Sequence, residues 1–441
     1  MKTSTLSLLF IISVLVAAAQ KKDSSLLKQF KFRSPSYIIA SVSGNAYGDL
    51  SANKQYGAQY HLALNPRLSI SKLVSTEQLY SVFYSDAAFS LSNSRANYVT
   101  GKRVVTDLSY SVSQSLQNKY YREKRYFLIS YNGTLSQHFF KSNNDYYTKS
   151  NNIGSTIIYT MGIGKGRIEN VTDAQMALYI LNDLQKNALL TRGFTTDDAY
   201  ELAKTITRVN NTRLFDSRRK RIYELKQLDS LFKNRGLVNE RSIEYFTTVT
   251  DNWFYAMNPQ RKNGTDRYAS ISPIISNDET RNRFYQPADS SQKLLNRSLG
   301  AFLTLGIEKA SALSLKKQFN RGISLVTQYT YTKSKNKYNN KEIVDVTKNS
   351  YSALNGFLEF GYYPNSRTNI SVNLVNNLAW VYSSNTLVNN MSVGFDGNYF
   401  ITYKTRVFVV AGLHAAASSR KFSDNANLNT SFNVGLQHFI R

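Results

Sequence analysis

Alternating apolar and polar residues run through most of this sequence of 441 residues and constrain its fold more than any other feature. Near the carboxyl end, Met391, Val393 and Phe395 alternate with Ser392 and Gly394. Successive side chains of a β-strand point to opposite faces, so the pattern predicts strands with one apolar and one polar face. We expect about fourteen such strands, at residues 36–49, 55–66, 77–93, 101–116, 124–140, 150–163, 265–276, 296–312, 320–335, 349–363, 366–383, 388–403, 405–418 and 426–440.

Alternating apolar and polar residues occur in the strands of two fold classes, the soluble β-sandwich and the transmembrane barrel, and segment length distinguishes them. Strands of a soluble β-sandwich average about 5 to 6 residues, whereas these segments run to about ten and beyond, the length that a tilted strand needs to cross a bilayer. The chain has no Cys, 31 Tyr and 24 Phe, which fits a protein held together by strand pairing with aromatic residues at the membrane interfaces. The predicted fold class is an all-β, antiparallel transmembrane β-barrel, with residues 36–163 as its first half and 245–441 as its second.

Residues 164–244, between the sixth and seventh predicted strands, break the alternation. Within them, Ala177, Leu181 and Leu184 recur at the spacing of an amphipathic helix. The prediction is a small α-helical insertion, with helices over about residues 172–187, after Thr195, and over residues 213–235.

The Gly-rich stretch Gly162–Arg167 stands at the start of this insertion. Its backbone N–H groups could face a phosphate or carboxylate. However, it lacks the Lys-Ser or Lys-Thr ending of a nucleotide-binding P-loop. We therefore expect a flexible exit from the strand into the insertion.

The first residues, 1–19, have the pattern of a secretory signal peptide. Lys2 is followed by an apolar core from Leu6 to Val16 and by three Ala before the expected cleavage site. Residues 20–35 follow as a periplasmic lead, with a helical turn expected near Leu26. An exported, Cys-free, Tyr-rich and strand-rich chain indicates the outer membrane of a Gram-negative bacterium.

Connection lengths orient the predicted barrel. Residues 319–321 and 364–366 read as tight turns, whereas residues 336–348, 383–388 and 420–428 read as longer polar loops. Barrels of this class place short turns in the periplasm and long loops outside the cell. Both termini and the insertion 164–244 are therefore expected in the periplasm.

The formal net charge is +26, which raises the question of an anionic partner. Nucleic acid is not expected, because the chain is exported and its basic residues are scattered along strands and loops. Outer-membrane lipid and lipopolysaccharide are the expected partners of these charges. A solvated basic surface without a specific ligand is the alternative.

The insertion carries both acidic and basic side chains, as a surface in water does. Such a surface suits docking to a periplasmic protein or to peptidoglycan, and a bundle that braces the barrel floor is equally compatible. The densest basic run, Arg218, Arg219, Lys220 and Arg221, is the candidate partner-docking site. On a helix these four side chains would point around the whole circumference, so a solvated face is the competing interpretation.

Candidate catalytic groups are few, and no catalytic residue, cofactor or metal site is assigned. The chain has four His, and none stands in an H-E-x-x-H motif or at paired metal-ligand spacing. His138 follows Ser136 on one strand face, and a Ser–His pair is what a barrel-embedded hydrolase of phospholipid or lipopolysaccharide would need. Ser is so common in barrels that a chance neighbour is also expected, and hydrolysis is the alternative to a non-enzymatic function.

The predicted interior is rich in neutral polar side chains. Barrels of 16 to 18 strands leave a water channel and those of about 8 leave almost none, so a barrel of intermediate size allows a narrow pore, a plugged pore or a packed interior. The residues predicted to line the lumen are His61, Glu359, Asn373, Asn377, Asp396 and Asn398.

The chain resembles outer-membrane β-barrel proteins of the Bacteroidota type. The resemblance rests on Tyr- and Asn-rich strands, on turns such as Gly361–Asn365, and on a strand that ends the chain. It implies that the last strand carries the signal read by the outer-membrane assembly machinery during biogenesis, with Leu428, Phe432 and Leu436 on its apolar face. It implies no catalytic residues.

Overall fold

The computed structural model describes residues 24–53, 57–98, 101–143, 148–212, 217–238, 242–255, 261–284, 290–339, 341–402, 405–419 and 425–438. The predicted signal peptide, residues 1–19, lies outside the described residues. The polar lead contains a short helix, α2 (Ser24–Gln29), where a helical turn was expected.

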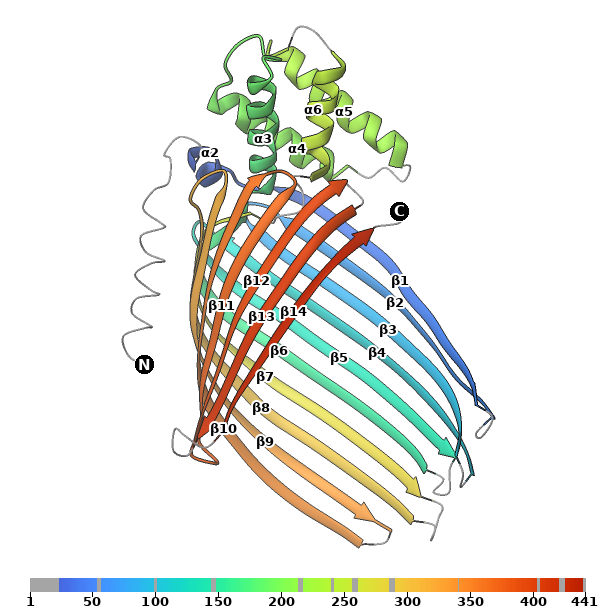
Figure 1. The fold of residues 1–441 in the computed structure, drawn as a ribbon. Helices are drawn as coiled ribbons and strands as arrows, with labels where there is room; N and C mark the ends of the chain where they lie inside the picture. Colours follow the sequence, from blue (N-terminus) through green and yellow to red (C-terminus); the bar gives the residue numbers. More distant parts are fainter. Residues whose placement is uncertain are drawn as a thin grey trace.

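One antiparallel sheet of 14 strands follows the order of the sequence, as predicted (Figure 1). Its strands are β1 (Ser34–Asn53), β2 (Gly57–Ser75), β3 (Leu79–Tyr98), β4 (Gly101–Arg122), β5 (Arg125–Asn143), β6 (Thr148–Asn170), β7 (Lys262–Phe284), β8 (Ser290–Ala312), β9 (Lys317–Tyr338), β10 (Lys341–Asn365), β11 (Thr368–Val381), β12 (Thr386–Thr402), β13 (Thr405–Ser419) and β14 (Asn425–His438).

Most strands are longer than the alternating pattern predicted. Residues 336–348, expected as a loop, mostly continue the hairpin of β9 and β10, which pair from Tyr338 and Lys341 onward. Residues 383–388 likewise reduce to a turn before β12 begins at Thr386. The difference in loop length between the two ends of the sheet is therefore smaller than the sequence suggested.

In the described residues the sheet has two edges, β1 and β14. Strand β1 pairs with β2, and β14 pairs with β13. In the described part of the chain, no backbone pairing joins β1 to β14. The ends of these two strands that are remote from the helices lie on opposite sides of the molecule in Figure 1. The sheet is thus a strongly curved barrel wall with a seam between its first and last strands.

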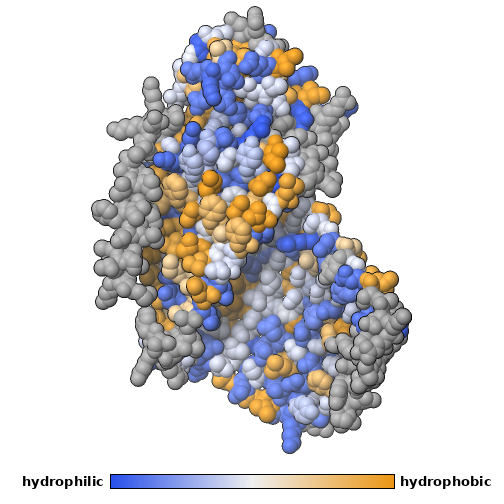
Figure 2. Space-filling model, in the orientation of Figure 1, coloured by the Kyte–Doolittle hydropathy of each residue, from blue (hydrophilic) through white to orange (hydrophobic). Residues whose placement is uncertain are grey.

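The two faces of the sheet differ in chemistry. Directly paired residues share a face, so the apolar row Phe127, Ile163 and Leu305 lies on one face, and these side chains are 44, 65 and 46 % exposed. The other face carries the polar side chains. Figure 2 shows hydrophobic residues gathered over the strands below the helices and hydrophilic residues over the helical end. An exposed apolar outer face with a polar inner face is the arrangement of a strand-built membrane protein.

The connection between β6 and β7 holds the helical insertion. Its helices are α3 (Thr172–Lys186), α4 (Thr196–Asn210), α5 (Ser217–Asn234) and α6 (Ile243–Tyr255). The predicted limits 164–244 are wrong at both ends, because β6 runs to Asn170 and α6 to Tyr255. Among the described residues no helix is both long and apolar enough to cross a membrane.

The stretch Gly162–Arg167, predicted as a flexible exit, lies inside β6 and pairs with both β5 and β7. A Cβ on Gly164 would lie 2.2 Å from the ring of Tyr126. A Cβ on Gly162 would similarly meet the Ala269 carbonyl oxygen at 2.7 Å. These glycines therefore make room for neighbours within the sheet and do not mark a loop.

The helices enclose the main hydrophobic core of the molecule. Leu181, Ile206, Leu228 and Phe232, from three different helices, are fully buried. α2 joins this core through Leu26, Leu27 and Phe30, and the β8–β9 turn joins it through Leu315. Helix α4 starts at a capping box formed by Thr195 and Asp198.

Asp198, in this capping box, titrates far from its usual range. Burial alone would raise its pKa, but hydrogen bonds from Arg192 and Thr195 outweigh burial and lower the pKa to about 2. The carboxylate therefore stays charged at neutral pH, where it satisfies the helix amino terminus.

Candidate functional site

A buried arginine lies at the junction between the helical domain and the sheet. Arg261, which directly precedes β7, is fully buried. Its guanidinium donates to three carbonyl oxygens between Ser314 and Lys317 at 2.6 to 3.0 Å and to Gln318 Oε1 at 2.9 Å. The ring of Tyr363 lies 4.8 Å from the guanidinium carbon. Burial lowers the pKa of Arg261 to about 10, which leaves it charged at neutral pH.

Further contacts tie two helices to the same end of the β10–β11 hairpin. The Tyr179 hydroxyl on α3 donates to the Tyr363 carbonyl oxygen at 2.8 Å, and burial raises the pKa of Tyr179 to about 12. Asp251 on α6 pairs with Arg367 in the β10–β11 turn at 2.5 Å. The domain is therefore held at one end of the sheet by several independent contacts.

Beneath the helices, the inner face of the sheet encloses a chamber of about 490 Å³ lined by charged and aromatic side chains. Asp266 on β7 is nearly buried there. It pairs with Lys119 Nζ at 2.5 Å and accepts a hydrogen bond from the Tyr126 hydroxyl at 2.7 Å.

A second cation, Arg167 on β6, lies at the upper edge of the chamber. Its guanidinium donates to the Thr76 carbonyl oxygen at 2.6 Å and to Ser75 Oγ at 2.7 Å. The rings of Tyr80 and Tyr121 lie 5.7 and 4.9 Å away. Lys119 and Arg167 are thus both engaged by neighbours, and an entering solute would have to compete with these contacts.

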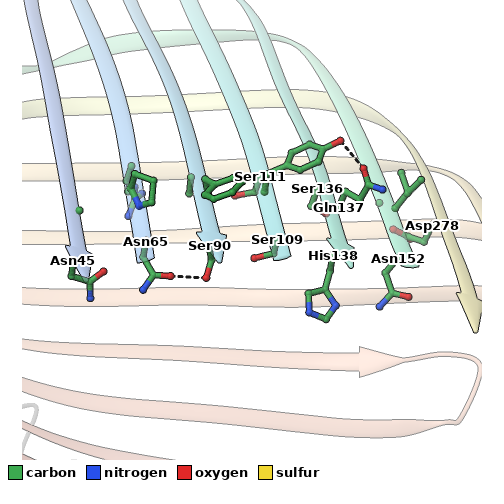
Figure 3. Close-up of a pocket in the computed structure, with 18 of the residues that line it drawn as sticks. Asn45, Asn65, Ser90, Ser109, Ser111, Ser136, Gln137, His138, Asn152 and Asp278 are labelled. Carbon is green, nitrogen blue, oxygen red and sulfur yellow. Dashed lines mark hydrogen bonds between the residues drawn. The ribbon is translucent and has the colours of Figure 1, made fainter. Parts of the chain in front are cut away.

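Farther from the helices, a polar groove of about 800 Å³ crosses β1 to β7. Figure 3 shows Asn45, Asn65, Ser90, Ser109, His138 and Asn152, one from each of six successive strands, pointing to the same side. Ser90 Oγ donates to Asn65 Oδ1 at 2.5 Å. Gln137, which accepts from the Tyr110 hydroxyl at 2.8 Å, lies on the opposite face.

One titratable pair stands next to this groove. His138 Nε2 lies 2.9 Å from Asp107 Oδ1, and the side chains are 41 and 37 % exposed. Ser109 is the direct ladder partner of His138. Asp107, Ser109 and His138 are therefore on the same face of two adjacent strands, in the residue types of a Ser–His–Asp hydrolase. The sequence pointed to Ser136 and missed Asp107, because the register between β4 and β5 cannot be read from the spacing along the chain.

The residues predicted to line the lumen fall into two separate places. Five lie on three adjacent strands, β10 to β12, and share one face: Glu359, Asn373, Asn377, Asp396 and Asn398. Glu359 accepts from Asn320 Nδ2 at 2.9 Å, and Asn398 donates to Asn369 Oδ1 at 3.0 Å. His61 lies on β2, far from the others in the strand order. Within this group, Glu359, Asn377 and Asn398 form side-chain hydrogen bonds to a neighbouring strand.

The predicted docking run lies in the first turns of α5. Arg219 and Arg221 are exposed, and Lys220 reaches Glu224 at 3.8 Å. The side chain of Arg218 lies outside the described residues. Glu224 is nearly buried and accepts from Trp253 Nε1 at 3.0 Å, and burial raises its pKa. In the described part of the chain, no group of three His, Asp or Glu side chains could hold a metal ion.

The fold defines the class of the protein: an antiparallel transmembrane β-barrel wall with a helical domain docked at one end. No family model matches the sequence, and no curated protein matches it either. The solved structures to which the chain shows similarity include the following three. The ferric yersiniabactin uptake receptor FyuA from Yersinia pestis is 8 % identical, with a TM-score of 0.38.

The other two similar structures are more distant. The β domain of the Bordetella autotransporter BrkA is 8 % identical with a TM-score of 0.30, over 81 % of this chain and 98 % of that one. OmpT, an outer membrane protein of Vibrio cholerae, in a form lacking loop L8, is 7 % identical with a TM-score of 0.25, over 92 and 99 %. The match to FyuA covers 90 % of this chain but spans 57 % of the receptor's length. At these identities and TM-scores the matches say nothing about the activity of this chain.

Proposed function

We propose that this protein is a non-enzymatic outer-membrane β-barrel of a Gram-negative bacterium, of the Bacteroidota type, that anchors its helical domain on the periplasmic side. The exposed apolar face supports a membrane location, because side chains such as Ile163 and Leu299 are 65 and 60 % exposed. The edges of β1 and β14 carry backbone groups that need partners in a bilayer, so closure of the seam is expected there.

The observation that carries the proposal is the environment of Arg261. A plug that leaves the barrel during transport would need a junction that opens at low cost. The guanidinium fixes the start of β7 to the β8–β9 turn. The backbone of the same residue is hydrogen-bonded to the start of α3, from Arg261 N to Thr172 Oγ1 at 2.9 Å and from Val171 N to the Arg261 carbonyl oxygen at 2.8 Å. Undocking the helices would leave these buried backbone groups unpaired. This junction holds the domain in one orientation, as a docking platform requires.

The exposed side of α5 is the proposed docking surface. Its exposed residues include Arg219, Arg221, Lys226 and Lys233, while its acidic Glu224 is nearly buried. A partner with anionic groups, either a periplasmic protein or peptidoglycan, suits this charge.

Site-specific photocrosslinking of the full chain in its own cells tests the platform. A photoreactive residue at Arg219 or Lys226 is expected to give a discrete adduct, and one at Ser383, in the β11–β12 turn at the other end of the sheet, is the control. With the photoreactive residue at Lys226, charge reversal at Arg219, Arg221 and Lys233 should abolish the adduct. An adduct pattern unchanged by charge reversal would contradict docking through α5.

The side on which the domain lies has a separate test. A Cys at Asn187, exposed in the turn after α3, should resist an impermeant thiol reagent in intact cells, whereas a Cys at Ser383 should react. The reverse labelling pattern would contradict the periplasmic assignment.

A transport pore is the other form of the same proposal, and the polar chamber beneath the helices supports it. Planar-bilayer recordings of the full chain separate the two forms. A platform with paired charges in its chamber predicts no unitary conductance, whereas regular conductance steps would favour a pore.

Hydrolysis is a second candidate because Asp107 and His138 are paired beside Ser109. The three side chains lie on the polar face, so a soluble ester would reach them more readily than bilayer phospholipid. Turnover of phospholipid, lipopolysaccharide or a soluble nitrophenyl ester that disappears in His138→Ala and Ser109→Ala, but persists in Gln137→Ala and His61→Ala, would support an enzyme. Equal rates in all four variants would remove this candidate.

A further inference from the structure

Four basic residues form a row across the outer face of the sheet, at the end that carries the helices. Arg122, at the end of β4, pairs directly with Arg125 on β5. Arg125 pairs in turn with Lys165 on β6, and Lys165 with Arg267 on β7. All four side chains are exposed.

Direct cross-strand neighbours of like charge repel each other, since their Cβ atoms are only about 4.5 to 5.5 Å apart. In the described residues none of the four forms an ion pair or a side-chain hydrogen bond with an acid. The opposite end of the same face differs, because Glu279 there pairs with Arg281 and with Lys293. The basic row therefore lacks, within the described chain, the counter-charge that its own sheet provides elsewhere.

The next row on the same face is entirely apolar. This row consists of successive ladder partners on β4 to β8: Tyr120, Phe127, Ile163, Ala269 and Leu305. The first four lie two residues along their strands from the members of the basic row, and Leu305 extends the row onto β8. The change from charged to apolar occurs within one pleat of the strands, which is the profile of a membrane interface.

A hollow of about 770 Å³ joins the two rows. Ala269 lies between the larger side chains Ile163 and Leu305, so the surface is recessed at that point. The hollow is lined by basic side chains on one side and by aromatic and aliphatic side chains on the other. Its shape and polarity fit an amphiphile with an anionic head and an apolar chain.

We propose that this row is a binding site for an anionic phospholipid, whose headgroup phosphate lies among Arg122, Arg125, Lys165 and Arg267. One acyl chain fills the recess at Ala269. Long basic side chains cover apolar surface with their stems while their charged ends reach the headgroup layer. This proposal rests on the proposed membrane location. It adds the class of lipid that binds at one place on the barrel.

The test is the electron spin resonance of spin-labelled lipids with the full chain in phosphatidylcholine vesicles. The wild-type protein is expected to associate with labelled phosphatidylglycerol at least about threefold more strongly than with labelled phosphatidylcholine at low salt, and less so at high salt. The variant R122Q/R125Q/K165Q/R267Q should lose this preference. A matched control, R219Q/R221Q/K226Q/K233Q on α5, removes the same charge and should retain it.

Two further measurements separate the outcomes. Ala269→Phe keeps every charge but fills the recess, and it should lower phosphatidylglycerol association by about twofold. Inorganic phosphate, compared with a chloride solution of equal ionic strength, should not displace the lipid. Displacement by phosphate, or equal lipid preference in the quadruple variant and the wild type, would overturn the lipid site.

Flotation of the vesicles distinguishes this failure from failure of the membrane location. A protein that floats with the vesicles but shows no lipid preference contradicts the lipid site alone. A protein that does not float contradicts the membrane location itself.

Discussion

The helical domain and the sheet use the same apolar residue types in opposite ways. In the helices Leu181, Ile206 and Leu228 are 0 % exposed, whereas on the sheet Leu299 and Leu303 are 60 and 51 % exposed. The helices bury these side chains against one another, as a domain in water must. The sheet leaves its apolar side chains for a solvent that is itself apolar, so burial within the protein is not what stabilises this part.

The difference also explains where charges are held. On the helical side, carboxylates such as Asp173 and Glu224 are buried and hydrogen-bonded inside the domain. On the sheet, the nearly buried Asp266 faces the polar chamber with Lys119 and Tyr126. Each region thus keeps its charges away from its own apolar surface.

The largest effect is expected at the junction between the two regions. Arg261→Ala should lower the free energy of unfolding of the protein by about 3 kcal/mol or more, because four acceptors in the β8–β9 turn and at the start of β9 lose a charged donor. Circular dichroism melting and limited proteolysis of the reconstituted protein measure it. Arg219→Ala, on the exposed side of α5, is the control and should change stability by less than about 0.5 kcal/mol. An unchanged melting curve in Arg261→Ala would contradict a stabilising role of the buried guanidinium at this junction.

Two Leu→Ala substitutions, one in the helical core and one on the apolar face of the sheet, compare a region that folds in water with one that faces the bilayer. Leu181→Ala opens a cavity in the helical core and should cost about 2 to 5 kcal/mol. Leu303→Ala removes a side chain that is 51 % exposed, so its effect in a bilayer should be much smaller. Leu303→Arg, by contrast, should cost about 2 to 4 kcal/mol in a bilayer. Equal costs for the two Ala variants, measured by denaturant unfolding in vesicles, would contradict the contrast.

The smallest effect is a pH dependence of the helical domain. Burial raises the pKa of Asp173 to about 6, although hydrogen bonds such as that from Thr207 oppose the shift. Because the folded pKa lies above the unfolded value, the folded state binds the proton more tightly. The contribution of Asp173 to stability therefore falls as pH rises from about 4 to about 6, by at most about 3 kcal/mol, and is constant above that range.

Asp173→Asn isolates this contribution. Subtracting the pH profile of the variant from that of the wild type removes groups such as Asp198, whose lowered pKa acts in the opposite direction at lower pH. A difference that stays flat between pH 4 and pH 7 would contradict the assignment to Asp173.

The order of strands and helices could be predicted from the sequence, because the strand alternation and the helical spacing are both local patterns. The alternation around Met391–Phe395 and the helical spacing of Ala177, Leu181 and Leu184 depend on near neighbours alone. The strand ends were predicted too short, since the alternation fades where both faces become polar, as in residues 333–337, while backbone pairing continues. Helix α6 was missed because its sequence, rich in Thr, Val and aromatic residues, has the composition of a strand.

The candidate sites were harder to predict because they depend on register. Arg261 has no local signal that distinguishes it from other basic residues; its burial comes from a turn that lies 53 to 56 positions away. The pairing of His138 with Asp107 and the row from Arg122 to Arg267 likewise appear only when the strands are aligned. The lumen-lining and docking residues named from the sequence stay predictions.

The hydrogen bond from Val171 N to the carbonyl oxygen of Arg261, at 2.8 Å, bears on how the wall is assembled. Residues 171–261 separate β6 from β7, and closing a flexible loop of that length has an entropic cost that grows with the loop. A helical domain that folds first brings its two ends to hydrogen-bonding distance, so that the two strands meet as if joined by a tight turn. The order of events at the membrane would then be domain before sheet, with the insertion setting the register from which β7 to β14 are added.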